Sequence, residues 1–221
     1  MIPTALGAPH YTEGEVDLVW FRQAGATHVT LLDTLNPGIA DSDRFVSALT
    51  TARGVWFGGG RQWILADVYL HTKAAEAIRA VLDRGGVVGG VSAGATFLGS
   101  YLVRGDERDD TVMMAPAHEE GLGLLQNVAV DQHVVGRHRE SDLDIVLAAH
   151  PELIGIGIDE GTAAIVRDQQ LEVMGRSVVL MHDGSPQPSG VTYLTLHAGD
   201  RYDLARLSKV GRAPASKSIR R

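Results

Sequence analysis

The residues best suited to chemistry lie at positions 90–94, which read Gly-Val-Ser-Ala-Gly. An apolar run precedes them, and small residues typical of a helix start follow. In a sharp turn between a strand and a helix, neighbours without bulky side chains let the backbone close up and push the central hydroxyl outward. The amides at the start of the helix then lie beside the negative charge that develops during acyl transfer. The pattern predicts that Ser92 is a nucleophile at the end of a strand.

A structural alternative explains the same five residues. Serine is a favoured N-cap, so Ser92 in a glycine-rich turn can simply begin a helix. Four glycines at positions 85–90, together with the apolar strand before the serine and the helix after it, favour the nucleophile.

A serine nucleophile needs a base, and His133 is the best candidate among the nine histidines. It ends an apolar stretch at 127–133, where α/β sheets place active-site groups. A dense polar run at 137–139 follows it. The alternative is a structural histidine at a strand end. His118 is expected in a surface loop. Six further histidines are expected to be surface or packed residues, namely His10, His28, His71, His150, His182 and His197.

The acid that orients the base is expected at the end of another strand. Asp159 and Glu160 directly follow the apolar stretch that begins at residue 153. An acidic turn between two strands is the alternative. Given Ser92 and His133, Glu160 is preferred as the third member of a triad, and Asp159 is then a neighbouring structural carboxylate.

A glycine run at 58–60 follows the short apolar strand expected at 54–57. Glycines there let backbone N–H groups approach a ligand closely, which suits a second part of an oxyanion hole. A phosphate cradle is the alternative, but the run lacks the Gly-Lys-Ser/Thr ending of a P-loop.

The elements around these residues alternate between strand-like and helix-like segments, which predicts an α/β protein with a mainly parallel sheet. The last third is expected to be more antiparallel. We expect one domain over 1–210 and a disordered basic tail over 211–221. Further strands are expected at 27–34, 87–91, 153–159 and within 162–181, and helices at 62–83, ending at a glycine C-cap, at 93–103 and at 141–149.

Composition excludes several classes of function. The net charge of −7 argues against general nucleic-acid binding. The absence of cysteine rules out disulfides, zinc–thiolate sites and a cysteine nucleophile. No apolar run approaches the length of a membrane span, and the chain as given shows no signal peptide, so no membrane partner is expected. No cofactor is expected. A metal enzyme is disfavoured, because no His-Glu-x-x-His motif occurs and because His133 and His138 lack an obvious third ligand.

Four segments together resemble the cyanophycinases and related aspartyl dipeptidases (peptidase E-like), which are the S51 serine peptidases. These segments occur in the family's order and read FGGGRQ, GGVVGGVSAGA, VDQHVVGRHR and GIGIDEGTA. The resemblance implies a flavodoxin-like, class-I glutamine-amidotransferase-like three-layer sandwich. It implies Ser92 as nucleophile, His133 as base and Glu160 as acid. It also implies an oxyanion hole formed by Gly59, Gly60 and Ala93.

The same resemblance implies a substrate with an aspartyl unit, such as a β-Asp-Arg or Asp-X bond. Arginine grips a carboxylate through two parallel hydrogen bonds, and an aspartate can hold an amine or guanidinium. Arg61 stands where cyanophycinases have an acid, and Asp142 where they have a third arginine, which affects substrate choice more than the triad. The residues that match the family's binding positions are Gln62, Asp131, Gln132, Arg137 and Arg139.

Two further hypotheses remain open at this stage. The same exposed serine can act as a promiscuous esterase or amidase, and a non-catalytic relative can use the cleft to bind an amino acid or peptide. The family usually has a strand before the segment that opens this chain. We therefore expect either an upstream segment or compensation by self-association, for example as a homodimer.

Overall fold

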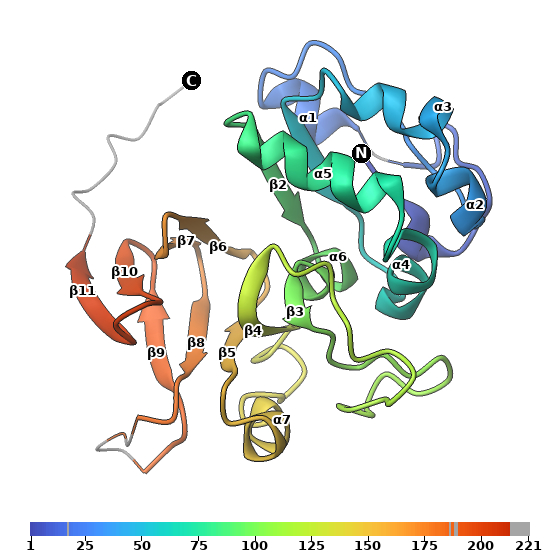
Figure 1. Cartoon of the computed structure of the whole chain (residues 1–221). Coiled ribbons are helices and arrows are strands. Elements are labelled where there is room, and N and C mark those ends of the chain that lie inside the picture. The colour runs from blue at the N-terminus through green and yellow to red at the C-terminus, as the bar shows by residue number, and fades with distance from the viewer. Residues whose placement is uncertain (17, 186, 188–189, 213–221) are drawn as a thin grey trace. The chain divides into compact units, whose positions relative to one another are not determined.

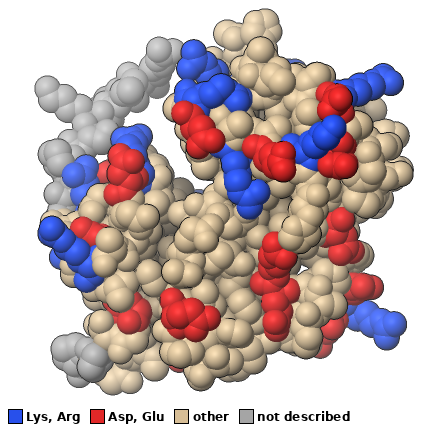
Figure 2. All heavy atoms as spheres, viewed as in Figure 1, with Lys and Arg blue, Asp and Glu red and all other residues tan. Residues whose placement is uncertain are grey.

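The computed structural model describes residues 1–16, 18–185, 187 and 190–212. The chain divides into two compact units, Met1–Val130 and Asp131–Arg221. Among the described residues, no helix combines the length and apolar character needed to cross a bilayer. On the face shown in Figure 2, Lys and Arg side chains are interspersed with Asp and Glu and do not gather in one basic stripe.

The first unit is built on parallel strand pairs. β1 (Gly54–Phe57) pairs with β2 (Val87–Gly90), and β3 (Gly99–Tyr101) pairs with the start of β4 (Leu125–Gln132) (Figure 1). Ile2 adds a parallel bridge to Phe57 on β1. Parallel pairing brings the carboxyl ends of β1 and β2 together, and these are the ends that lead into the glycine run and the Ser92 turn.

Helices pack on these strands and bury one core. The aromatic rings of Phe57, Tyr69 and Phe97 meet edge to face at its centre, with centroids 5.3–6.1 Å apart. Leu65 and Ile78 are fully buried beside them. The helical elements of this unit are η1 (Thr4–Leu6), α1 (Val19–Gln23), α2 (Pro37–Ala40), α3 (Asp43–Val46), η2 (Ser47–Leu49), α4 (Gln62–Tyr69), α5 (Lys73–Asp83) and α6 (Ala93–Phe97).

The long helix predicted at 62–83 is two helices. Leu70 leaves the helical conformation with ψ 142°, and His71 has a φ of 59°. The side chain of Asp41 then accepts a hydrogen bond from the Lys73 amide at 2.9 Å and so caps the start of α5. The predicted glycine C-cap is confirmed, because Gly85 has a φ of 77° and its amide donates to the Leu82 carbonyl at 2.8 Å.

Two other predicted elements are wrong. The segment 27–34 is not a strand, although it is rich in β-branched residues. A strand needs a ladder of hydrogen bonds to a neighbouring strand. In this segment the structure describes two backbone bonds to Met1. The Met1 amine donates to the Thr30 carbonyl, and the Leu32 amide donates to the Met1 carbonyl. The helix predicted at 93–103 ends at Phe97, and the chain enters β3 at Gly99.

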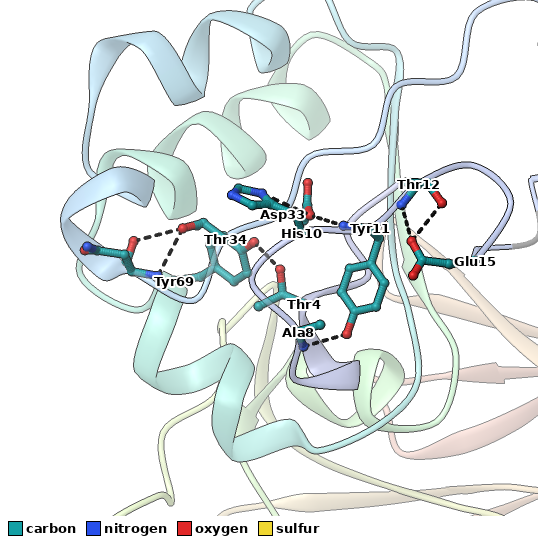
Figure 3. Close-up of polar contacts among 10 residues, drawn as sticks. Thr4, Ala8, His10, Tyr11, Thr12, Glu15, Asp33, Thr34 and Tyr69 are labelled. Carbon is teal, nitrogen blue, oxygen red and sulfur yellow. Dashed lines mark hydrogen bonds and ion pairs between the residues drawn. The ribbon is translucent and has the colours of Figure 1, made fainter.

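A polar network fixes the N-terminal segment against α4 (Figure 3). The hydroxyls of Thr4 and Tyr69 lie 2.7 Å apart, and burial raises the pKa of Tyr69 well above its usual range. The Tyr11 hydroxyl accepts from the Ala8 amide, and Asp33 accepts from the Tyr11 amide. This network holds η1 in place, and η1 in turn contacts the glycine run.

The second unit is antiparallel in the strand pairs that lie within it, as predicted for the last third of the chain. β5 (Ile154–Ile158), β8 (Val178–His182) and β9 (Leu194–His197) pair in that order, with α7 (Leu143–Ala149) packed on β5 and β8. A second sheet has the order β11-β10-β7-β6. Its strands are β6 (Thr162–Arg167), β7 (Gln170–Gly175), β10 (Asp200–Asp203) and β11 (Ser208–Arg212).

The predicted basic tail overlaps this second sheet. Residues 211 and 212 belong to β11, and 213–221 lie outside the described residues. The expectation of one domain over 1–210 stays a prediction.

Candidate active site

Ser92 occupies a strained turn between β2 and α6. Its φ of 53° and ψ of −120° lie in a region that residues with a side chain rarely adopt, at a cost of about 1–3 kcal/mol. A Cβ on Gly90 would lie 2.4 Å from the Gly94 carbonyl carbon, and one on Gly94 would lie 2.4 Å from the Phe57 carbonyl oxygen. Glycine is therefore required on both sides of Ser92 for the backbone to turn this sharply.

The alternative of a capping serine does not fit this geometry. The Ser92 side chain makes no capping hydrogen bond to α6. A true capping serine is found elsewhere in the same unit, where the Ser42 hydroxyl accepts from the Phe45 amide at 3.3 Å and begins α3. The strain at Ser92 is therefore not repaid by a helix cap, which favours a chemical role for its hydroxyl.

Replacing Gly94 with alanine is expected to destabilise the protein. The new methyl group would meet the Phe57 carbonyl at 2.4 Å, and overpacking of this kind costs about 1–3 kcal/mol. Chemical denaturation of Gly94→Ala should show this loss in the free energy of unfolding. Gly14→Ala is the control, because the nearest atom to its added Cβ is the Thr12 hydroxyl at 4.0 Å. Equal stability of the two variants would contradict the packing described here.

The glycine run lies directly beside Ser92. A Cβ on Gly59 would lie 3.3 Å from the Ser92 Cβ and 3.8 Å from its Oγ. Gly60 has a φ of 137°, and its backbone passes so close to Ala5 that a Cβ would lie 2.1 Å from the Ala5 carbonyl oxygen. The amides of Gly58 and Arg61 donate to the Ile2 and Ala5 carbonyls, so the N-terminal segment fixes both ends of the run.

Gln62 follows the run as the first residue of α4 and is only 4% exposed. Its side-chain amide donates to the carbonyl oxygens of Val103 at 3.1 Å and Arg104 at 2.7 Å. These bonds tie the start of the loop after β3 to α4. The side-chain nitrogen of Gln62 therefore binds the protein's own backbone.

In the second unit, the structure brings His133 and Glu160 together. The Nδ1 atom of His133 and the Oε1 atom of Glu160 are 3.3 Å apart, and their side chains are 24% and 57% exposed. His133 has a φ of 58°, so the extended backbone of β4 ends at this residue. A base held at Nδ1 by a carboxylate keeps Nε2 for proton transfer, as in a serine hydrolase triad.

The remaining candidates differ in how exposed they are. Asp131 is fully buried at the end of β4, and its Oδ1 accepts from the Gln132 amide at 2.9 Å. Gln132 and Arg139 are also buried, whereas Arg137 is exposed. Arg137 is therefore the cation of this turn that a ligand in solvent can reach directly.

Two histidines without a sequence signal lie in polar clusters. His182 is buried, and its Nδ1 lies 3.0 Å from Asp144, whose other oxygen accepts from the Thr192 hydroxyl. Burial lowers the pKa of His182 despite the opposing effect of Asp144, and so favours the neutral form of the ring. His118, expected on the surface, is instead packed against Trp63 and lies 2.9 Å from Asp67.

Comparisons with known proteins show which family and fold the chain resembles. The profile of peptidase family S51 matches residues 1–174. A cyanophycinase of Nostoc sp. (strain PCC 7120) is 35% identical, over 92% of this chain and 74% of its own length.

Two solved structures have a similar fold. The crystal structure of a peptidase from an acI-B1 Actinobacterium superimposes with a TM-score of 0.65, at 26% identity, over 91% of this chain and 81% of that chain. A putative peptidase E protein from Listeria monocytogenes EGD-e gives a TM-score of 0.57 at 17% identity, over 80% and 84% of the two chains, and shows the fold alone. These likenesses confirm the predicted mixed α/β fold with its parallel and C-terminal antiparallel strands.

Proposed function

The chain belongs to peptidase family S51 and is a serine-type peptidase, and on this premise we propose that Ser92, His133 and Glu160 form its catalytic triad. Membership confirms the resemblance carried by the four sequence segments. The observation that carries the proposal is the turn at Ser92, where a left-handed backbone and a hydroxyl that caps no helix coincide beside a glycine run.

The proposed reaction proceeds through an acyl-enzyme. The Oγ atom of Ser92 attacks the carbonyl carbon of the scissile bond while His133 takes its proton at Nε2. The imidazolium then gives this proton to the leaving amine as the scissile C–N bond breaks, which leaves the acyl group on Ser92. Water attacks the acyl carbon while His133 takes its proton. The bond to the Ser92 Oγ atom then breaks, His133 returns the proton to that oxygen, and the acyl group leaves as a carboxylic acid. Glu160, beside Nδ1, orients the ring and stabilises its charged form.

Backbone amides of the first unit are proposed to stabilise the negative oxygen of the tetrahedral intermediate. Gly59 lies beside Ser92, and neither Gly59 nor Gly60 has a side chain that would block the approach of a substrate. Ala93 is the first residue of α6, where amides lack partners within the helix. Donors fixed in advance cost no reorganisation during the reaction, and one such donor is worth about 3–4 kcal/mol.

The substrate is proposed to carry an aspartyl unit, with the scissile bond of the β-Asp-Arg or Asp-X type. The exposed Arg137 is assigned to the substrate carboxylate, because a guanidinium pairs with a carboxylate through two hydrogen bonds. Asp131, Gln132, Arg139 and Gln62 complete the proposed binding groups. The name of the cyanophycinase relative supports this class of substrate.

A panel of small substrates tests this assignment. It contains β-Asp-Arg, α-Asp-Arg, Ala-Arg and p-nitrophenyl acetate, each assayed with the wild-type chain and with Arg137→Gln. We expect turnover of an aspartyl dipeptide and much slower turnover of Ala-Arg. Arg137→Gln should raise KM for the aspartyl substrate about tenfold or more, since the pair to a carboxylate is lost, and leave ester hydrolysis unchanged.

Other patterns would contradict parts of the proposal. Equal turnover of Ala-Arg and the aspartyl dipeptides would remove the aspartyl specificity. Hydrolysis of the ester alone would favour a general esterase on the same serine. An unchanged KM in Arg137→Gln would remove that residue from the binding site.

A further inference from the structure

The carboxylate of Asp159 holds the turn that carries His133. Asp159 directly follows β5 and is only 9% exposed. Its Oδ1 accepts hydrogen bonds from the amides of Val135 and Gly136, both at 3.0 Å. Its Oδ2 accepts from the Ser177 hydroxyl at 2.5 Å. Its own amide donates to the Val178 carbonyl at 3.1 Å, so the carboxylate is anchored on a sheet.

The turn needs such an acceptor because its backbone coils like the first turn of a helix. The Arg137 amide donates to the His133 carbonyl at 2.9 Å, and the Arg139 amide donates to the Val134 carbonyl at 2.7 Å. The amides of Val135 and Gly136 lie at the start of this turn, where the first N–H groups have no acceptor within the turn. Asp159 supplies the acceptor from 24 and 23 residues away, in the way that an N-cap residue does locally.

The position of this turn sets the distance between His133 and Glu160. A Cβ on Gly136 would lie 3.3 Å from the Glu160 Oε1 atom, which is the same oxygen that lies 3.3 Å from the His133 ring. Glu160 therefore packs against the turn and pairs with its first residue. The left-handed φ of His133 is strained, and strained residues persist only where the surroundings hold them.

We propose that Asp159 is a positioning residue of this peptidase, which fixes the turn after His133 so that the imidazole stays paired with Glu160. This inference rests on the proposed triad and adds to it a residue that touches neither substrate nor reacting atoms. Adjacent carboxylates then have separate tasks, because Asp159 binds backbone amides and Glu160 binds the imidazole.

The charge of Asp159 suits this task. Burial alone would raise the pKa of Asp159, but hydrogen bonds from Ser177 and from backbone amides outweigh it and lower the pKa below its ordinary value. The carboxylate is therefore ionised at neutral pH, and hydrogen bonds to an ionised acceptor are about twice as strong as neutral ones.

The test compares Asp159→Ala and Asp159→Asn with Asp203→Ala. Asp203 is a matched control in the same unit, because it is 8% exposed and its Oδ1 also accepts two backbone amides, from Ala205 at 3.0 Å and Arg206 at 2.9 Å. Each variant is assayed for kcat and KM with an aspartyl dipeptide, alone and combined with Glu160→Gln. Thermal melts establish the fraction folded.

A positioning role predicts a specific set of results. Asp159→Ala should lower kcat about ten- to a hundredfold, as expected when a catalytic group is misplaced by about 1 Å, with little change in KM. Asp159→Asn keeps an oxygen for the two amides and a donor for Ser177, so it should recover most of kcat. Asp203→Ala should lower the melting temperature but not kcat. When Glu160→Gln is already present, either change at Asp159 should lower kcat little further.

The outcomes separate this inference from the proposed function. If Glu160→Gln and His133→Ala leave kcat unchanged, the triad is wrong. Two results would overturn the positioning role while the triad stands. In the first, folded Asp159→Ala keeps the wild-type kcat. In the second, the fold-loss in kcat of the double variant equals the product of the losses of Asp159→Ala and Glu160→Gln. If Asp159→Ala does not fold, Asp159→Asn carries the same test. The positioning role predicts that Asp159→Asn lowers kcat less than Asp159→Ala would, and that it lowers kcat no further when Glu160→Gln is already present.

Discussion

Ser92→Ala is expected to abolish turnover and to leave the stability of the protein nearly unchanged. Removing a triad serine in other hydrolases costs about a millionfold in kcat, because no other group attacks the carbonyl carbon. Alanine keeps the Cβ, so the strain at the left-handed φ stays the same. The Ser92 hydroxyl caps no helix, so its removal takes no cap from α6. Assays with an aspartyl dipeptide and a thermal melt measure both effects.

Ser42→Ala is the matched control for this prediction. Its hydroxyl caps α3 through the Phe45 amide, and loss of a cap costs about 1 kcal/mol of stability. We therefore expect the opposite result, a lower melting temperature with normal turnover. Residual wild-type turnover in Ser92→Ala would place the nucleophile elsewhere.

His133→Ala is expected to lower kcat by about a thousandfold or more, since the serine then has no base. Glu160→Gln should lower kcat less, because it weakens the orientation of the ring but leaves the imidazole in place. Steady-state kinetics of each variant with an aspartyl dipeptide measure both effects.

His138→Ala is the control for the base. His138 lies five residues further along, is exposed and has a φ of 56°, so the backbone setting resembles that of His133. Its removal should leave kcat unchanged. A large loss in His138→Ala together with normal turnover in His133→Ala would show that the base had been assigned to the wrong histidine.

The Ser92 turn could be predicted from sequence because its causes are local. Glycine at positions 90 and 94 is required by contacts within the turn and with the neighbouring strand β1. The pairing of His133 with Glu160 was predictable for a related reason, since each lies within two residues of the end of an apolar strand. The sequence left open whether the serine capped a helix, and in the structure the Ser92 side chain makes no capping hydrogen bond to α6.

Features that depend on distant partners were not predictable. The break between α4 and α5 is stabilised by Asp41, which lies 32 residues before the amide that it caps. Nothing in the local pattern shows that Ser177 bonds to Asp159, or that this carboxylate holds the turn after His133. The extended segment 27–34 has the composition of a strand, yet strand formation depends on a partner that composition does not reveal.

The measurement that tests the central claim most directly is covalent labelling of Ser92. The wild-type chain and Ser92→Ala are treated with a fluorophosphonate, which reacts with activated serines, and each intact mass is recorded. The account predicts a single adduct on the wild-type chain, mapped to the peptide that contains Ser92, and none on the variant. An unlabelled but folded wild-type chain, or an equal adduct on Ser92→Ala, would contradict the assignment of Ser92 as the nucleophile.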